Sequence, residues 1–263
     1  MSGLGKAGHV PAFASGESDA ALAQRLAAAA GELLLSLRTA GALTGQALGD
    51  AGDKAANALL LHELRAARPD DAILSEEAAD SAERLTSRRV WIIDPLDGTR
   101  EYREGRSDWA VHVALAIDGK PVLGAVALPS LDLILCSDAP MPLPALGAPL
   151  KMLVSRTRPA AEALFVAETL GAELVPMGSA GAKAMAVVRG EADIYLHSGG
   201  QFEWDNCAPA AVAFAAGLHV SRADGSELCY NNPNPYLPDL LICRKELAAD
   251  VLRLTADYLR GQE

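Results

Sequence analysis

Two aspartates stand three residues apart where an apolar stretch of the chain ends. Residues 90–93 are all bulky and apolar, which predicts a buried strand, and Asp94-Pro95-Leu96-Asp97-Gly98-Thr99 follows directly. Two carboxylates leaving one buried strand repel each other unless a cation lies between them. Gly98 and Thr99 can begin a helix, whose first amides face an anion such as phosphate. These residues therefore predict a site for a metal ion and a phosphate.

The same residues also fit an exposed turn, because Asp-Gly and Asx-Pro turns are common in loops. Two features favour the site. The preceding strand is uniformly apolar, so the turn opens at the end of a core element. A second acidic pair, Glu76-Glu77, follows another short apolar run at residues 72–74. Taken singly, these acids would more often be surface groups, and Asp205 would be a helix cap.

The segment from Asp94 to Thr99 resembles the signature of the inositol monophosphatase superfamily, which consists of Mg²⁺-dependent, lithium-sensitive phosphatases. The companion signature, Trp-Asp followed by small residues and a glycine, corresponds to residues 204–209, with Gly217 closing the helix. The third element of the family pattern is an acidic residue, which corresponds here to Glu76 and stands in the expected order. Three elements in the same order over residues 76–217 make the resemblance specific.

The resemblance implies an α/β fold of α-β-α-β-α layers, a five-layer sandwich with the site between two halves. It also implies two or three Mg²⁺ ions. Glu76, Asp94 and the carbonyl of Leu96 would hold the first ion. Asp94, Asp97 and Asp205 would hold the second, on the leaving-group side. A third ion, mostly bound to water near Glu76, occurs in some members.

Water is the expected nucleophile, since the chain has no nucleophile motif such as Gly-x-Ser-x-Gly. By resemblance, the hydroxyl of Thr99, held by Asp53, and the carboxylate of Glu76 orient this water and help to deprotonate it. Bound metal ions would stabilise the attacking and leaving oxygens of an in-line displacement. Asp53 also fits an ordinary N-cap for a helix predicted to run from this residue to Pro69.

The C-terminal half is expected to carry the substrate pocket. Gly178 and Ser179 open a predicted helix, whose amides and hydroxyl would bind a substrate hydroxyl or a second phosphate. Lys183 is either a solvated helix residue or, by resemblance to CysQ-type bisphosphate nucleotidases, a ligand of that second phosphate. His197 stands where inositol-selective members carry a carboxylate, and it also fits a structural histidine. Gly98, Thr99 and Asp205 complete the predicted substrate-binding set.

On this resemblance the substrate is 3′-phosphoadenosine 5′-phosphate, which loses its 3′-phosphate to give AMP. A broad phosphatase acting on inositol 1-phosphate or fructose 1,6-bisphosphate is one alternative. A non-catalytic interaction partner is another, although the complete set of acidic ligands argues against it. The family expectation for the assembly is a homodimer.

The composition predicts a globular protein of 263 residues, half of them apolar. A net charge of −11 argues against binding a nucleic acid polymer and means that an anionic substrate needs bound cations. The four cysteines form no CxxC, three lie in contexts typical of buried positions, and residues 1–17 lack a signal segment, which favours a cytoplasmic chain. No apolar run approaches the ~18 residues that span a bilayer. Residues 1–17 are expected to be frayed.

A stretch rich in proline, alanine and leucine, 139–149, is the predicted linker between an N-terminal half, 1–138, and a C-terminal half, 150–263. Most metal ligands lie in the first half, and Asp205 and the substrate pocket in the second. Residues 41–52 are predicted as a loop. Apolar periodicity predicts further helices at 19–38, 159–171, 178–189, from 204, and 245–260, and strands at 109–117, 122–128, 131–136, 152–155, 173–176 and 193–196.

Overall fold

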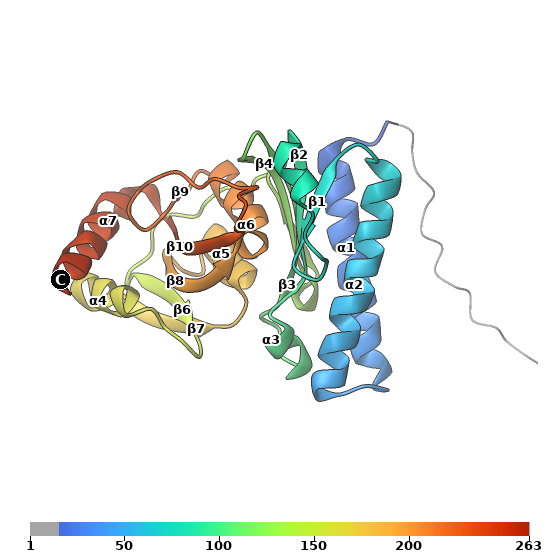
Figure 1. The fold of residues 1–263 in the computed structure, drawn as a ribbon. Coiled ribbons are helices and arrows are strands. Elements are labelled where there is room, and N and C mark those ends of the chain that lie inside the picture. Colours follow the sequence, from blue (N-terminus) through green and yellow to red (C-terminus); the bar gives the residue numbers. More distant parts are fainter. Residues whose placement is uncertain (1–15, 263) are drawn as a thin grey trace, which may run out of the picture.

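The computed structural model describes residues 16–262, which form five layers stacked in the order α-β-α-β-α (Figure 1). The first helical layer contains α1 (Asp19–Ala40) and α2 (Gly45–Ala67), the middle one α5 (Ala180–Val188) and α6 (Glu203–Ala215), and the last α4 (Ala161–Leu170) and α7 (Lys245–Arg260). The predicted α/β five-layer sandwich is confirmed. The expectation that residues 1–17 are frayed concerns mostly residues outside the described range.

The first sheet has the strand order β1-β2-β3-β4-β5, with β1 parallel to β2 and the other pairs antiparallel. Its strands are β1 (Ala72–Ser75), β2 (Arg89–Asp97), β3 (Ala110–Ile117), β4 (Lys120–Leu128) and β5 (Leu133–Cys136). The short helix α3 (Thr99–Arg103) follows β2, and 3₁₀ turns cover Ala82–Thr86 and Pro129–Leu131.

The second sheet has the order β7-β6-β8-β10-β9, in which β6 is parallel to β7 and β8. Its strands are β6 (Lys151–Ser155), β7 (Glu173–Met177), β8 (Ile194–Phe202), β9 (His219–Ser221) and β10 (Tyr236–Cys243). Residues 139–149, which connect the two sheets, form neither helix nor strand. The division into two halves at this segment stays a prediction.

Strand β2 is apolar on both faces because helices cover both sides of its sheet. Trp91 and Ile93 pack with α1 and α2, whereas Val90 and Ile92 pack with α5 and α6. Successive side chains of a strand point to opposite faces, so one continuous apolar run supplies two layers of the core. By this alternation Asp94 points towards the middle helical layer, as Val90 and Ile92 do.

The predicted loop at 41–52 is wrong, because α2 already begins at Gly45. Gly49 and Gly52 lie inside the helix, where they allow close packing. A Cβ on Gly49 would lie 2.9 Å from Cγ2 of Thr99, and one on Gly52 would lie 3.1 Å from Cδ2 of Leu96. Asp53 is therefore inside the helix, and its interpretation as an N-cap is also wrong.

Two strands of the second sheet, β9 and the eight-residue β10, were not predicted from the sequence. Pro238 and Asp239 interrupt the apolar pattern of β10, and its pairing with β8 shifts between Leu237 and Asp239. Strand β8 also continues through Gly199 and Gly200, which were not expected in a strand. Because strands are stabilised by their partners, such irregular segments are hard to predict from local composition.

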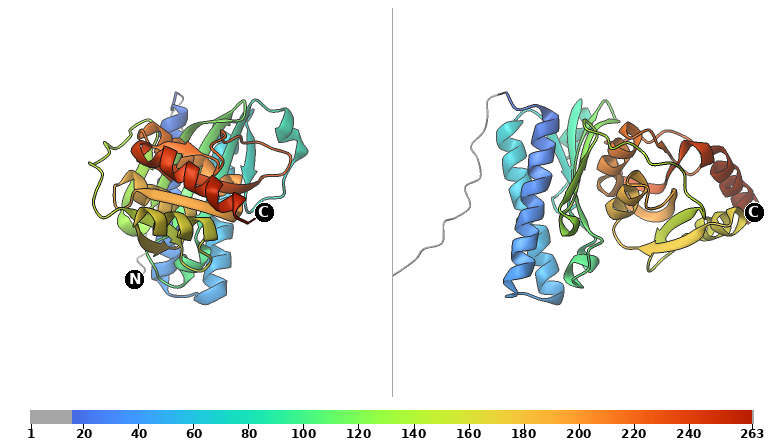
Figure 2. Two further views of the ribbon diagram at one scale, coloured as in Figure 1. Left: turned by 90° about the vertical axis from the view of Figure 1, so that its left-hand side faces the viewer. Right: turned by 180° about the vertical axis from the view of Figure 1, so that it is seen from behind.

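Helix α1 is long and apolar enough, by length and composition alone, to cross a membrane. The core helix of a globular domain passes the same test, and α1 packs its Leu22, Leu26 and Leu34 against the first sheet. Figure 2 shows α1 and α2 side by side across that sheet. The prediction of three buried cysteines is confirmed for Cys136, Cys207 and Cys243, while Cys229 is exposed.

Candidate active site

The parallel pairing of β1 and β2 brings two acidic segments together. Ser75 pairs with Ile93, so Glu76, which follows β1 directly, lies beside Asp94 of β2. The amide of Glu76 donates to the carbonyl of Ile93 at 3.4 Å, which continues the pairing by one residue. Sequence segments about twenty residues apart thus converge because parallel strands end on one side.

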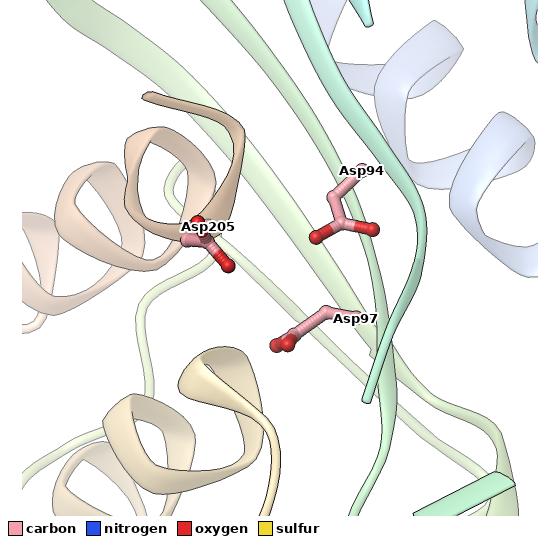
Figure 3. Close-up of side chains that lie close together, drawn as sticks. All are labelled: Asp94, Asp97 and Asp205. Carbon is pink, nitrogen blue, oxygen red and sulfur yellow. The ribbon is translucent and has the colours of Figure 1, made fainter. Parts of the chain in front are cut away.

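An irregularity in β2 turns Asp97 towards Asp94. In a regular strand, residues three apart point to opposite faces. Here Asp94 pairs with His112 of β3, but Asp97 pairs with Ala110, so β2 holds one extra residue. A bulge of this kind re-aims side chains, and Figure 3 shows Asp94 and Asp97 directed into the same space, with Asp205 entering from α6.

Asp94, Asp97 and Asp205 each offer an oxygen atom, and these three atoms lie within 4.8 Å of one another. Asp94 is fully buried, and its Oδ2 has no hydrogen-bond partner among the described residues. A buried, unpartnered carboxylate oxygen beside two further carboxylates fits a hard divalent cation. Glu76 lies next to Asp94 but outside this group of three.

The acidic groups raise one another's pKa values. Burial, followed by the charges of Glu76 and Asp97, raises the pKa of Asp94 well above its usual range. Burial and the charge of Asp205 raise the pKa of Glu76 to about 7, and burial and the charge of Asp97 raise the pKa of Asp205 to about 7. The protein alone therefore disfavours full ionisation of the cluster, and a bound cation would favour it.

Asp97 differs from the other acids because it is held by donors. Burial alone would raise its pKa, but His112, the hydroxyl of Ser179 and the amide of Gly181 together lower it. Nε2 of His112 lies 3.2 Å from Oδ2 of Asp97, and its Nδ1 lies 3.0 Å from the carbonyl oxygen of Trp204. His112 therefore links Asp97 to the helix that carries Asp205.

Sequence reasoning missed His112. Its signal was a single polar residue within the otherwise apolar strand at 109–117.

The contacts of Asp97 also revise the expected role of the α5 amides. The amides of Ala180 and Gly181 donate to Asp97, at 3.1 and 2.6 Å, and the amide of Gly178 donates to Asp108, so none of the three is left for a second phosphate.

A buried polar network fixes the first turn of α6. Glu203 accepts hydrogen bonds from the amides of Asn231 and Asn232, at 2.6 and 2.8 Å. Arg84, which follows the Glu76 loop, donates to the side chain of Asn231 and the carbonyl of Asn232. This network ties the segment that carries Glu76 to the helix that carries Asp205. Asp205 also caps that helix, since it accepts from the amide of Phe202 at 2.6 Å.

The predicted water-orienting residues Thr99 and Asp53 are in contact. Oγ1 of Thr99 lies 3.3 Å from Oδ1 of Asp53 and 3.2 Å from the carbonyl oxygen of Leu96. Burial and the charge of Glu77 raise the pKa of Asp53 to about 6. The hydroxyl of Thr99 has one proton, so it can donate to only one of the two acceptors at a time and can accept from a third group.

A cavity of about 470 Å³ adjoins the acidic cluster. Every predicted substrate-binding residue except Thr99 lines it: Gly98, Gly178, Ser179, Lys183, His197 and Asp205. Asp97 lies in its wall too, so the cavity reaches the cluster directly.

Lys183 is buried, so its interpretation as a solvated residue is wrong. Its ammonium group donates to the carbonyls of Gly178 and Ser179 and lies 5.2 Å from the ring centre of Tyr195. Burial lowers its pKa to about 8. His197 Nε2 lies 2.9 Å from the carbonyl oxygen of Gly199, and burial with the charge of Lys183 lowers the pKa of His197 to about 4.

Known proteins resemble this chain over nearly its whole length. Residues 17–259 match the sequence profile of the inositol monophosphatase family. A Mycobacterium tuberculosis protein named 3′-phosphoadenosine 5′-phosphate phosphatase is 52% identical over 245 residues, covering 88% of this chain and 91% of the relative. The 3′(2′),5′-bisphosphate nucleotidase CysQ of Salmonella typhimurium is 32% identical over 207 residues, covering 71% of this chain and 81% of the relative.

The fold has a counterpart among solved structures. The crystal structure of CysQ from Bacteroides thetaiotaomicron, a bacterial member of the same family, matches with a TM-score of 0.78 and 25% identity. The match covers 88% of this chain and 98% of that protein. The resemblance seen in the sequence is thereby confirmed, and the chain belongs to the inositol monophosphatase family of metal-dependent phosphatases.

Proposed function

We propose that this protein hydrolyses the 3′-phosphate of 3′-phosphoadenosine 5′-phosphate, releasing AMP and phosphate. The observation that carries the proposal is the make-up of the cavity. Carboxylates of Asp97 and Asp205 lie in its wall beside the acidic cluster, and Lys183 and three arginines, one of them paired with Glu101, line it as well. A substrate with two phosphates can place one beside metal ions at the carboxylates and the other near the basic groups. The names of the relatives support the same substrate.

Mg²⁺ fits the donor set, which consists only of oxygen atoms. In our proposal Glu76, Asp94 and the carbonyl of Leu96 hold one ion, and Asp94, Asp97 and Asp205 hold another. Bound Mg²⁺ would supply the positive charge that acidifies water and stabilises the oxygens of an in-line displacement. Asp97 can serve here despite its hydrogen bonds, because a carboxylate offers about four lone-pair sites.

The side chains around the metal site orient the reactants. The hydroxyl of Thr99, held by Asp53, forms a hydrogen bond with the attacking water, as donor or as acceptor. Glu76 receives a proton from this water. The pKa of Glu76 is raised to about 7 in the metal-free cluster, and bound Mg²⁺ would lower it, so that Glu76 would be an ionised acceptor for that water. Gly98, Ser179 and Asp205 surround the reacting phosphate, while Lys183 and the neutral His197 contact the rest of the substrate.

The test is phosphate release with Mg²⁺ from 3′-phosphoadenosine 5′-phosphate, inositol 1-phosphate and fructose 1,6-bisphosphate side by side. We expect kcat/KM for the nucleotide to exceed the others by about a hundredfold, which is about 2.7 kcal/mol of transition-state discrimination. Comparable rates would instead indicate a broad sugar phosphatase. If phosphate is released from none of the three substrates, a non-catalytic role is favoured.

Lithium at millimolar concentration is expected to inhibit turnover. Li⁺ is a small, hard cation that competes for oxygen ligands but carries half the charge of Mg²⁺, so it stabilises developing negative charge poorly. The check is an initial-rate titration with LiCl at fixed Mg²⁺, with NaCl at equal ionic strength as the control. Equal rates in both salts would contradict the prediction.

Our proposal also includes a homodimer, a cytoplasmic location and no binding of nucleic acid polymers. The four free cysteines are consistent with a reducing compartment. The net charge of −11 opposes association with DNA or RNA.

A further inference from the structure

Three arginines line the active-site cavity, and their partners differ. Arg156 donates from Nη2 to the carboxylates of Glu101 and Glu104, at 2.8 and 2.9 Å. Arg100 and Arg158 have no carboxylate within 4.0 Å among residues 16–262. An arginine that remains unpaired in an acidic protein, in the wall of a cavity, is available to a ligand anion.

Of Arg100 and Arg158, Arg158 is better placed to bind an anion, because it lies beside other residues that line the cavity. It follows β6, where its amide donates to Oγ of Ser155 at 3.2 Å. Its Nη2 and Nη1 lie 3.7 and 3.8 Å from the point where a Cβ of Gly200 would stand. Gly200 has φ +74°, a conformation that favours glycine, and the guanidinium lies at van der Waals distance from this position.

Arg158 and Lys183 both act on His197, which Glu162 affects in the opposite sense. After burial, the charge of Lys183 has the largest effect in lowering the pKa of His197, and the charge of Arg158 also lowers it. Both cations therefore act on the same part of the cavity. Lys183 has three donors, of which two are taken by the carbonyls of Gly178 and Ser179, whereas Arg158 keeps its guanidinium donors free among the described residues.

We propose that Arg158 binds the second phosphate of the substrate, the one that is not hydrolysed, and so determines the preference for bisphosphates. The proposal rests on the bisphosphate substrate proposed above. A guanidinium can hold a phosphate through two parallel hydrogen bonds, which Lys183 with one remaining donor cannot. Arg158 also neutralises part of the repulsion between that phosphate and the carboxylates around the metal site.

The test compares Arg158→Gln with wild type on two substrates, 3′-phosphoadenosine 5′-phosphate and adenosine 3′-monophosphate, which lacks the second phosphate. For the bisphosphate we expect kcat/KM to fall about ten- to a hundredfold, because a charge-assisted hydrogen bond pair is lost. For the monophosphate we expect a change of less than about threefold. Arg65→Gln, an equal charge change on the outer helix α2, is the matched control and should alter neither value.

Arg158→Lys adds a second measurement, since it keeps the charge but not the bidentate geometry, and should lie between wild type and Arg158→Gln. Thermal unfolding of each variant checks that the exposed substitution leaves the fold intact. Equal losses for both substrates, or no loss for the bisphosphate, would overturn the role of Arg158 while wild-type turnover of the bisphosphate upholds the proposed function. No turnover of the bisphosphate by wild type would overturn both.

Discussion

Replacing Asp94 with asparagine is expected to reduce kcat/KM by at least about a thousandfold, because this residue contributes to both proposed metal sites. An amide offers one neutral oxygen where the carboxylate offers two charged ones, so cation binding weakens at both sites. The loss of kcat/KM should persist at saturating Mg²⁺, because a high Mg²⁺ concentration does not restore the charged ligand that both sites lack in this variant. Near-normal turnover at high Mg²⁺ would contradict the ligand assignment.

The same substitution has a second expected effect, on stability. The pKa of Asp94 is raised because its charge is buried beside Glu76 and Asp97. Removing that charge relieves the repulsion, so the metal-free variant should unfold at a temperature no lower than wild type. Mg²⁺ should raise the unfolding temperature of wild type but not of Asp94→Asn, since only a bound ligand stabilises the folded state. Thermal unfolding in EDTA and in Mg²⁺ measures both effects.

Asp138→Asn provides the control for this pair of measurements. Asp138 is exposed in the segment after β5 and lies outside the residues that line the cavity. Its substitution changes the net charge equally but should leave turnover and the Mg²⁺-dependent shift unchanged. A similar loss in both variants would indicate that overall charge, rather than the metal site, controls activity.

The acidic cluster could be predicted because its signal is local. Asp94 and Asp97 follow an apolar strand within one motif, and that motif, together with Trp204-Asp205, carried the family resemblance. The contact between them could not be predicted, since it depends on the bulge that pairs Asp97 with Ala110. That bulge exists only when β3 lies beside β2, and no local pattern in residues 94–97 contains this information.

The groups that hold the site together were harder to find. His112 reaches Asp97 from a neighbouring strand and the carbonyl of Trp204 from a helix 92 residues away in the sequence. Arg158 lies in a polar stretch of the sequence and Lys183 among small and apolar residues, and only the folded cavity distinguishes the unpaired guanidinium from the tethered ammonium. Contacts between distant segments decide the chemistry of these residues, whereas composition decides only that they are basic.

Gly181→Ala is expected to destabilise the protein and to lower turnover together. A Cβ at this position would lie 2.0 Å from Nε2 of His112, far inside van der Waals contact. His112 is fully buried and cannot simply move aside, so the start of α5 must shift and with it the amide that donates to Asp97. Overpacking of this kind costs about 1–3 kcal/mol, which lowers the unfolding temperature by roughly 2–10 °C for a protein of this size.

A double-variant cycle identifies the cause. If the clash with His112 is responsible, Gly181→Ala should cost much less in a His112→Ala background, where the colliding ring is absent. Gly147→Ala is the matched control, because a Cβ there would meet nothing within 4 Å. Additive losses in the double variant would show that helix α5 is sensitive for another reason. If instead the two losses of stability are non-additive and Gly147→Ala is as stable as wild type, Gly181 is required so that His112 can reach Asp97. A residue without a side chain would then help to support the proposed metal site.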